Sequence, residues 1–170
     1  MAEWGTVWQG VGVFTAVLFG SVGLFKIYHE LKRLNEQRKK DLEDKKTALK
    51  HRRTEMFLAQ HRRLFDNEDL YEVLSLIDND DPKLACPDFS DKKRKFLVFF
   101  EEIELLCKSD QITRGVAVYM FGYYAKCAQI GPNFATGINM DKKHWALFFE
   151  FADHYSQWES SEDRSFPKDI

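Results

Sequence analysis

Two short basic motifs are the features of this sequence best suited to binding chemistry. They share the pattern His-Arg-Arg and comprise His51, Arg52, Arg53, His61, Arg62 and Arg63. Guanidinium groups bind phosphate oxygens bidentately, so a pair of arginines suits a phosphorylated ligand. The motifs are about ten residues apart, which places them on neighbouring faces if the segment is one helix.

Nearby aromatic side chains could stack on bases, so we expect the arginine pairs to bind an anionic, nucleotide-like ligand. The candidate ligand-binding residues are Arg52, Arg53, His61, Arg62, Arg63 and Asn133. Asn133 lies in a segment rich in Gly and Asn, residues 129–139. Two simpler interpretations of the arginine pairs stay open: attraction to the anionic inner leaflet of a membrane, and plain solubility.

A further basic run, Lys-Lys-Arg-Lys at residues 92–95, is less specific. It is expected to be the solvated first turn of a helix rather than a second anion site. Residues 142–144 form a shorter run, Lys-Lys-His.

The sequence carries no motif of an enzyme that we can identify. It lacks a Gly-rich phosphate loop, an HExxH zinc motif and a nucleophile elbow. Glu101, Glu102 and Glu104 could act as acid–base groups, but they are expected to form the polar edge of an amphipathic helix. We therefore predict no catalytic residue and no cofactor.

Metal binding is not expected either. Cys86, Cys107 and Cys127 are spaced too widely for a C-x-x-C motif, and the histidines are scattered. The acidic run at residues 78–81 lacks the spacing of a calcium-binding EF-hand loop and is expected to be a plain loop. The cysteines are interpreted as free, buried thiols in a reducing cytosol.

The arginine pairs follow an uncharged apolar segment that we predict to cross a membrane. No charged residue occurs from Trp4 through Phe25, and a helix of this length would span ~33 Å, enough for a ~30 Å hydrocarbon core. A cleaved signal peptide is the alternative, but no Lys or Arg precedes the segment and no Ala-x-Ala follows it. Basic residues crowd the C-terminal flank, so the N-terminus is expected outside and the remainder in the cytoplasm.

Small residues recur every four positions in this segment, at Gly12, Ala16 and Gly20. They share one helical face, where small side chains let two membrane helices approach closely. We expect this face to pack in a homo-oligomer. Gly is common in membrane helices for other reasons, which is the alternative.

The next segment is expected to be a helical stalk. Residues 26–66 contain neither Pro nor Gly and are rich in strong helix formers. Leu42, Leu49 and Met56 recur at intervals of seven, which favours self-association, although a solvated single helix is the alternative. The predicted divisions are an anchor at residues 1–26, a basic stalk at 27–55, a cytosolic domain at 56–158 and a polar tail at 159–170.

Apolar stripes at helical spacing predict that the cytosolic domain is all-α, with four or five helices in a compact bundle. Asn67 is expected to cap one helix, and residues 87–90 to introduce a Phe-rich one. Residues 129–139 are expected to be irregular, and Asp141 to begin the last helix.

The expected core positions of the two central helices follow from these stripes. They are Phe96, Phe99, Phe100, Ile103, Leu106 and Cys107 in one helix, and Val116, Tyr119, Met120, Tyr123 and Cys127 in the next.

Two runs of residues suggest relatives. FFEEIELL at residues 99–106 and VYMFGYY at residues 118–124, followed by a Trp/Phe-rich helix, resemble a bacterial domain family of unknown function. Its members often carry one N-terminal membrane helix and a basic stalk. The resemblance covers residues 64–158 and the overall layout.

The layout also resembles the small membrane effectors of type III CRISPR systems. That resemblance implies a bacterial inner-membrane location and a tetramer that binds cyclic tetra-adenylate rather than DNA. It implies a role in antiviral defence through disturbance of the membrane. The alternative function is a membrane-tethered scaffold that docks a protein and binds no small molecule.

Overall fold

The computed structural model describes residues 4–161, with side chains from residue 25 onward. The chain divides into two compact units, Met1–Ala48 and Leu49–Ile170, and each is described by itself. Every regular element within residues 4–161 is a helix, so the prediction of an all-α fold is confirmed.

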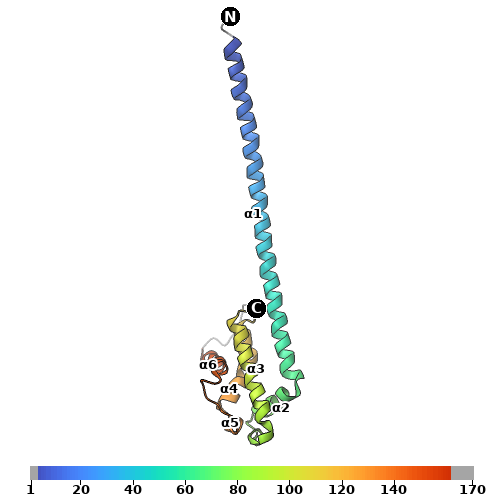
Figure 1. Ribbon diagram of the computed structural model, residues 1–170, viewed down its shortest axis with the longest axis vertical. Coiled ribbons are helices and arrows are strands. Elements are labelled where there is room, and N and C mark those ends of the chain that lie inside the picture. Colours follow the sequence, from blue (N-terminus) through green and yellow to red (C-terminus); the bar gives the residue numbers. More distant parts are fainter. Residues whose placement is uncertain (1–3, 162–170) are drawn as a thin grey trace. The chain divides into compact units, whose positions relative to one another are not determined.

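Helix α1 begins at Trp4 and ends at Asp66, and its residues up to Ala48 form the first unit (Figure 1). The predicted unbroken helix over residues 26–66 is thus confirmed. Within the described part of the chain, no helix is long and apolar enough to cross a membrane. The predicted membrane segment, residues 5–25, has its side chains outside the described residues except for Phe25. The predicted packing residues Gly12, Ala16 and Gly20 lie in that undescribed part as well.

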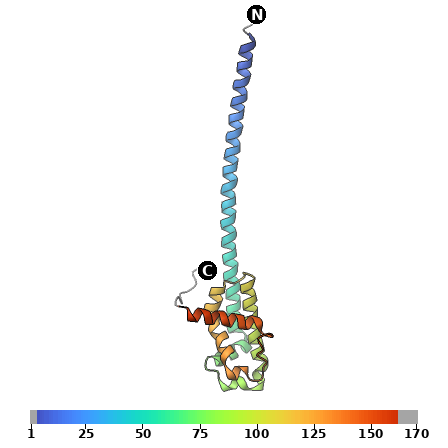
Figure 2. The same ribbon diagram turned by 90° about the vertical axis from the view of Figure 1, so that its left-hand side faces the viewer.

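The second unit is a bundle built on the last turns of α1. Its further elements are, in chain order, α2 (Glu68–Ile77), the single 3-10 turns η1 (Pro82–Ala85) and η2 (Pro87–Phe89), α3 (Ser90–Lys108), α4 (Arg114–Ile130), α5 (Pro132–Ala135) and α6 (Ala146–Ser160). Figure 2 shows α6 lying across the bundle, where it packs mainly on α4 and α3.

The start of α2 follows the predicted cap. The side-chain oxygen of Asn67 accepts a hydrogen bond from the backbone N–H of Leu70 at 3.1 Å, which satisfies one of the free donors of the first turn. Glu68 and Asp69 stand in that turn, where negative charge is stabilised by the helix dipole.

The core is dominated by phenylalanine. The predicted stripe of α3 is confirmed for Phe96, Phe99, Phe100 and Ile103, which are all fully buried. Leu106 and Cys107 are partly buried and pack against this core. The rings of Phe99 and Phe121 meet edge to face with centroids 5.8 Å apart, the geometry that aromatic quadrupoles favour. Aromatic edges of this kind fix the spacing between α3 and α4.

The predicted core face of α4 is wrong in part. Tyr119, Met120 and Tyr123 are exposed. The buried face of α4 carries smaller side chains and one ring, namely Ala117, Val118, Phe121, Gly122, Ala125 and Ala128. Small residues let α6 approach closely, so shape complementarity rather than hydrophobicity decided which face is covered.

Gly122 lies where α4 and α6 pack tightly against each other. A Cβ at this position would lie 2.3 Å from Cδ2 and 2.7 Å from Cβ of Tyr155 in α6. We expect Gly122→Ala to lower the free energy of unfolding by about 1–3 kcal/mol, because overpacking outweighs the gain in helix propensity. Denaturant unfolding measures this. Gly115→Ala, in the first turn of the same helix and partly exposed, is the matched control and should be neutral or stabilising.

Two boundaries near the C-terminus also differ from the prediction. The segment 129–139 is not wholly irregular, because α4 continues to Ile130 and α5 follows at Pro132–Ala135. Asp141 does not begin the last helix. Its carboxylate accepts from the N–H of Lys143 at 3.0 Å and closes a turn, whereas α6 begins at Ala146.

Candidate functional site

The first arginine motif lies beside the turn between α3 and α4. The Nε–H of Arg53 donates to the backbone oxygen of Asp110 at 3.1 Å, and its guanidinium also pairs with the carboxylate of Asp110. Asp110 adopts a positive φ of 59°, which Asp tolerates better than most residues. Arg53 therefore holds the α3–α4 turn, while Arg52 is exposed.

Two hollows meet at Arg53. A mixed polar recess of about 310 Å³ is lined by Leu49, Arg52, Arg53, Ser109, Asp110 and Gln111. An almost entirely apolar groove of about 190 Å³ is lined by Arg53, Thr54, Phe57, Leu58, Ile112, Thr113, Val116 and Met120. A cationic side chain between a polar recess and an apolar groove suits a ligand with an anionic part and a flat apolar part.

The second motif has different surroundings. His61 packs against Phe65 with ring centroids 4.7 Å apart. Arg63 pairs with Glu102 of α3, and its guanidinium carbon lies 5.8 Å from the ring centre of Phe99. Arg62 is exposed. Whether these residues bind a ligand stays a prediction.

The predicted solvated run at residues 92–95 contains one fully buried cation. Lys93 is 0% exposed, and its ammonium donates to the backbone oxygen of Leu84 at 2.6 Å and to that of Thr136 at 2.5 Å. Burial lowers the pKa of this ammonium. The solvated-face interpretation is therefore wrong for Lys93, which joins η1 to the segment after α5.

Asn133 is engaged by Asp80. The Asn133 side-chain amide donates to the backbone oxygen of Asp80 at 2.7 Å, and its backbone N–H donates to the Asp80 carboxylate at 2.9 Å. The N–H of Phe134 donates to the same carboxylate at 3.0 Å. Gly131 is required here, because a Cβ would lie 2.6 Å from Oδ1 of Asp80. The position of Asn133 is thus explained by the fold, and its predicted ligand role is untested.

A cluster of ionisable groups that the sequence interpretation overlooked lies between α3, α4 and α6. Glu104 is fully buried, and its Oε1 accepts from the guanidinium of Arg114 at 2.6 Å. The same guanidinium lies 2.6 Å from Nε2 of His154. Glu150 pairs with Lys108 at 2.8 Å.

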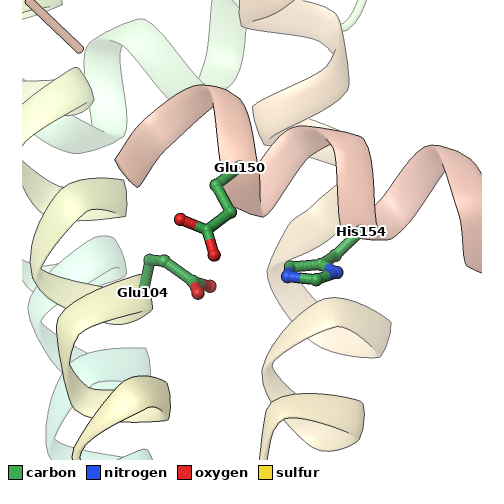
Figure 3. Close-up of side chains that lie close together, drawn as sticks. All are labelled: Glu104, Glu150 and His154. Carbon is green, nitrogen blue, oxygen red and sulfur yellow. The ribbon is translucent and has the colours of Figure 1, made fainter. Parts of the chain in front are cut away.

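The carboxylates of Glu104 and Glu150 and the ring of His154 converge (Figure 3). Burial, and secondarily the charge of Glu150, raise the pKa of Glu104 above its usual range, while Arg114 opposes that rise. Burial and Arg114 together lower the pKa of His154, so its ring is neutral at pH 7. The polar-edge interpretation of Glu104 is wrong, because its side chain points into the bundle.

The overlooked signal was the pair formed by Glu150 and His154. Residues four apart lie on one face of a helix, so these two could have been identified as a pair of potential ligands. The partner Glu104 could not, because the sequence does not show that α3 faces α6 at this level.

The three cysteines are free thiols, as predicted. Their predicted burial is wrong for Cys86, which is exposed, whereas Cys107 and Cys127 are partly buried. Burial, and secondarily the neighbouring Glu104, raise the pKa of the Cys107 thiol to about 12.

The burial of Cys107 and the exposure of Cys86 predict that the two thiols react with alkylating agents at different rates. At pH 8 we expect iodoacetamide to label Cys107 at least about 100-fold more slowly than Cys86, because the thiolate is the reactive species. Mass spectrometry of timed digests measures both rates. In denaturant the three thiols should react alike, and Cys86→Ser should remove the fast phase. Rapid labelling of Cys107 in the native protein would contradict its burial.

No family model, curated protein or solved structure matches the chain.

Proposed function

We propose that this chain is a membrane-anchored effector without enzymatic activity, whose helical domain binds a nucleotide messenger and self-associates. Cyclic tetra-adenylate is the proposed ligand, and antiviral defence in a bacterial inner membrane is the proposed setting. The observation that supports ligand binding is the position of Arg53 between the polar recess and the apolar groove.

The two hollows suit the two parts of a nucleotide. Arg52 and Arg53 offer several N–H donors to phosphate oxygens. The groove beside them offers Phe57 and Met120 to a base. Asp110 holds Arg53 in the free protein, and its carboxylate is 80% exposed, so a phosphate can replace it at little cost in desolvation.

The anchor and the assembly are supported by the sequence. An uncharged run reaches Phe25 and a basic segment follows it, the arrangement of a single-pass anchor with its domain in the cytoplasm. Gly12, Ala16 and Gly20 supply a small-residue face for helix packing in lipid. A tetramer is the proposed assembly.

Calorimetry on the full-length chain in mild detergent tests the ligand. Cyclic tetra-adenylate is expected to bind the native protein, and R52A/R53A is expected to weaken binding by about 100-fold, since two charge-assisted contacts worth ~1.5 kcal/mol or more each are lost. The matched control is K142A/K143A, which removes two exposed positive charges elsewhere and should bind normally.

Three results would contradict this proposal. The native chain could show no binding, the control could lose as much affinity as R52A/R53A, or only R62A/R63A could lose it. Light scattering of the detergent complex, with and without the nucleotide, measures the assembly.

A scaffold that docks a protein is the alternative. It is favoured by the exposed apolar side chains of Met120 and Leu58 on neighbouring helices. A stoichiometric protein partner whose binding does not change with nucleotide would support it.

A further inference from the structure

We propose that Glu104, Glu150 and His154 form a binding site for a divalent transition-metal ion of the Zn²⁺ class, for which Arg114 competes. This site goes beyond the proposed nucleotide binding and is separate from Arg53. Glu104 comes from α3, while Glu150 and His154 stand one turn apart on α6 (Figure 3).

The geometry is close to that of a metal site. One potential ligand atom from each residue lies within 4.8 Å of the other two. Ligand atoms around a tetrahedral ion bound at ~2.1 Å lie about 3.4 Å apart, so the atoms need to approach one another by at most about 1.4 Å to close the site. Side-chain rotation of the half-buried Glu150 and His154 can supply that movement.

An unsatisfied atom points to a ligand independently of this geometry. Glu104 is fully buried, and its Oε2 has no hydrogen-bond partner within the described part of the chain. A buried carboxylate oxygen normally has a donor or a cation, because desolvation without one is costly. Glu150 adds a second side chain with carboxyl oxygens beside this atom, so a cation between Glu104 and Glu150 would be bound by oxygens of both.

The guanidinium of Arg114 supplies part of the positive charge at this cluster. Its guanidinium contacts Oε1 of Glu104 and Nε2 of His154, each at 2.6 Å, so it occupies atoms that an ion would need. The Arg114 side chain is 35% exposed and stands at the first residue of α4, from which it can turn to solvent. Lys108, which pairs with Glu150, is similarly exposed.

The donor set selects the class of ion. One imidazole nitrogen and two carboxylate oxygens suit Zn²⁺ and its neighbours, whereas Ca²⁺ and Mg²⁺ prefer oxygen ligands alone. Two carboxylates balance the double positive charge. A shallow hollow of about 370 Å³, lined in part by Glu150, Asp153 and His154, gives an ion a route from solvent.

The test is metal binding by the full-length chain without an affinity tag. Titration with Zn²⁺ in a calorimeter should give one ion per chain, and Co²⁺ should give visible absorption of a nitrogen- and oxygen-bound ion. Glu150→Gln and His154→Ala remove half-exposed ligands and should weaken binding by more than the ~10–100-fold typical of losing a supporting hydrogen bond. Asp153→Asn lines the same hollow without being a ligand, and should bind normally.

Arg114→Met gives the sharper result. Removing the competing guanidinium should tighten Zn²⁺ binding by about tenfold or more, although the same change weakens the fold without metal. Circular dichroism of each variant confirms that it is folded before titration. The proposal is overturned by absent binding in the native chain, by unchanged affinity in both Glu150→Gln and His154→Ala, by a Co²⁺–thiolate band from cysteine, or by weaker binding in folded Arg114→Met.

Discussion

Arg114→Met is expected to lower the free energy of unfolding by about 3–5 kcal/mol at pH 8, in the presence of a chelator. The reason is the charge that remains. Glu104 is fully buried, and Arg114 is the cation that its carboxylate contacts at 2.6 Å. An ionised carboxyl group without this partner is costly inside the bundle. In the unfolded chain water solvates the same group, so the substitution raises the free energy of the folded state and leaves that of the unfolded state nearly unchanged.

The loss should shrink as the pH falls. Burial already raises the folded-state pKa of Glu104 above its unfolded value, and losing Arg114 raises it further. Above the unfolded pKa the folded protein then holds more protons than the unfolded chain, so its stability decreases as pH rises through that window. At pH 5 Glu104 is closer to neutral, and the variant should therefore lie nearer the native protein than at pH 8.

Two further variants separate the contribution of the Glu104–Arg114 ion pair from that of its neighbours. Lys108→Met removes the cation of a half-exposed pair with Glu150 and should cost no more than about 1 kcal/mol. The double change E104M/R114M removes the buried carboxylate together with its half-exposed partner and should recover most of the stability. Chemical denaturation at several pH values measures all three. A deficit that grows on acidification would contradict the assigned role of Glu104.

Lys93→Met is expected to cost about 2–4 kcal/mol at pH 7, because the buried carbonyl group of Leu84 and the partly buried carbonyl group of Thr136 each lose a charge-assisted donor. The methionine side chain fills a similar volume, so the cost comes from Leu84 and Thr136 rather than from a cavity. Removing a buried positive charge offsets part of this loss.

The neighbouring lysine supplies the control. Lys95 pairs with Asp69 at 2.5 Å, but its side chain is 61% exposed, and Lys95→Met should change stability by less than about 1 kcal/mol. Hydrogen exchange adds a local measurement, since Lys93→Met should loosen the amides near η1 and α5 first. Equal effects of the two changes would mean that the ammonium of Lys93 is dispensable.

Lys93 shows where reasoning from sequence stops. A run of four cations predicted a solvated face, and that holds for the exposed Arg94 and Lys95. Nothing in the run itself marks the one position that turns inward toward two carbonyl groups from distant segments. Local patterns report charge and spacing, while burial of a polar group depends on which segments meet.

The helices themselves were predictable for a related reason. A start signal such as Asn67 acts through neighbouring backbone groups, so it can be read locally. The buried face of α4 could not, because its exposed side carries Tyr119 and Met120, which are as apolar as its core side. The face of α4 that carries Gly122 is the buried one, because only glycine leaves room there for Tyr155 of α6. The spacing of apolar residues along one helix does not show such contacts between distant segments.

The same limit applies to the candidate sites. Arg52 and Arg53 were identified from residue type alone, and the structure places them beside a recess. Glu104 was assigned to a solvated edge, because three acidic residues in one helix usually face water. Its burial depends on α6, which is far from it in the sequence, and its ion pair depends on Arg114 of the next helix.

The contacts of Asp80 imply an order of assembly for the bundle. Asp80 has a positive φ of 45°, a strained conformation that its hydrogen bonds to Asn133 and Phe134 help to offset. These bonds join Asp80 to residues 53 and 54 positions further along the chain, so we expect them to form once α3 and α4 are in place. During synthesis α2 and α3 leave the ribosome well before Asn133 does. We therefore expect the hydrogen bonds between Asp80 and Asn133 to form late in folding, so that their loss speeds unfolding more than it slows folding.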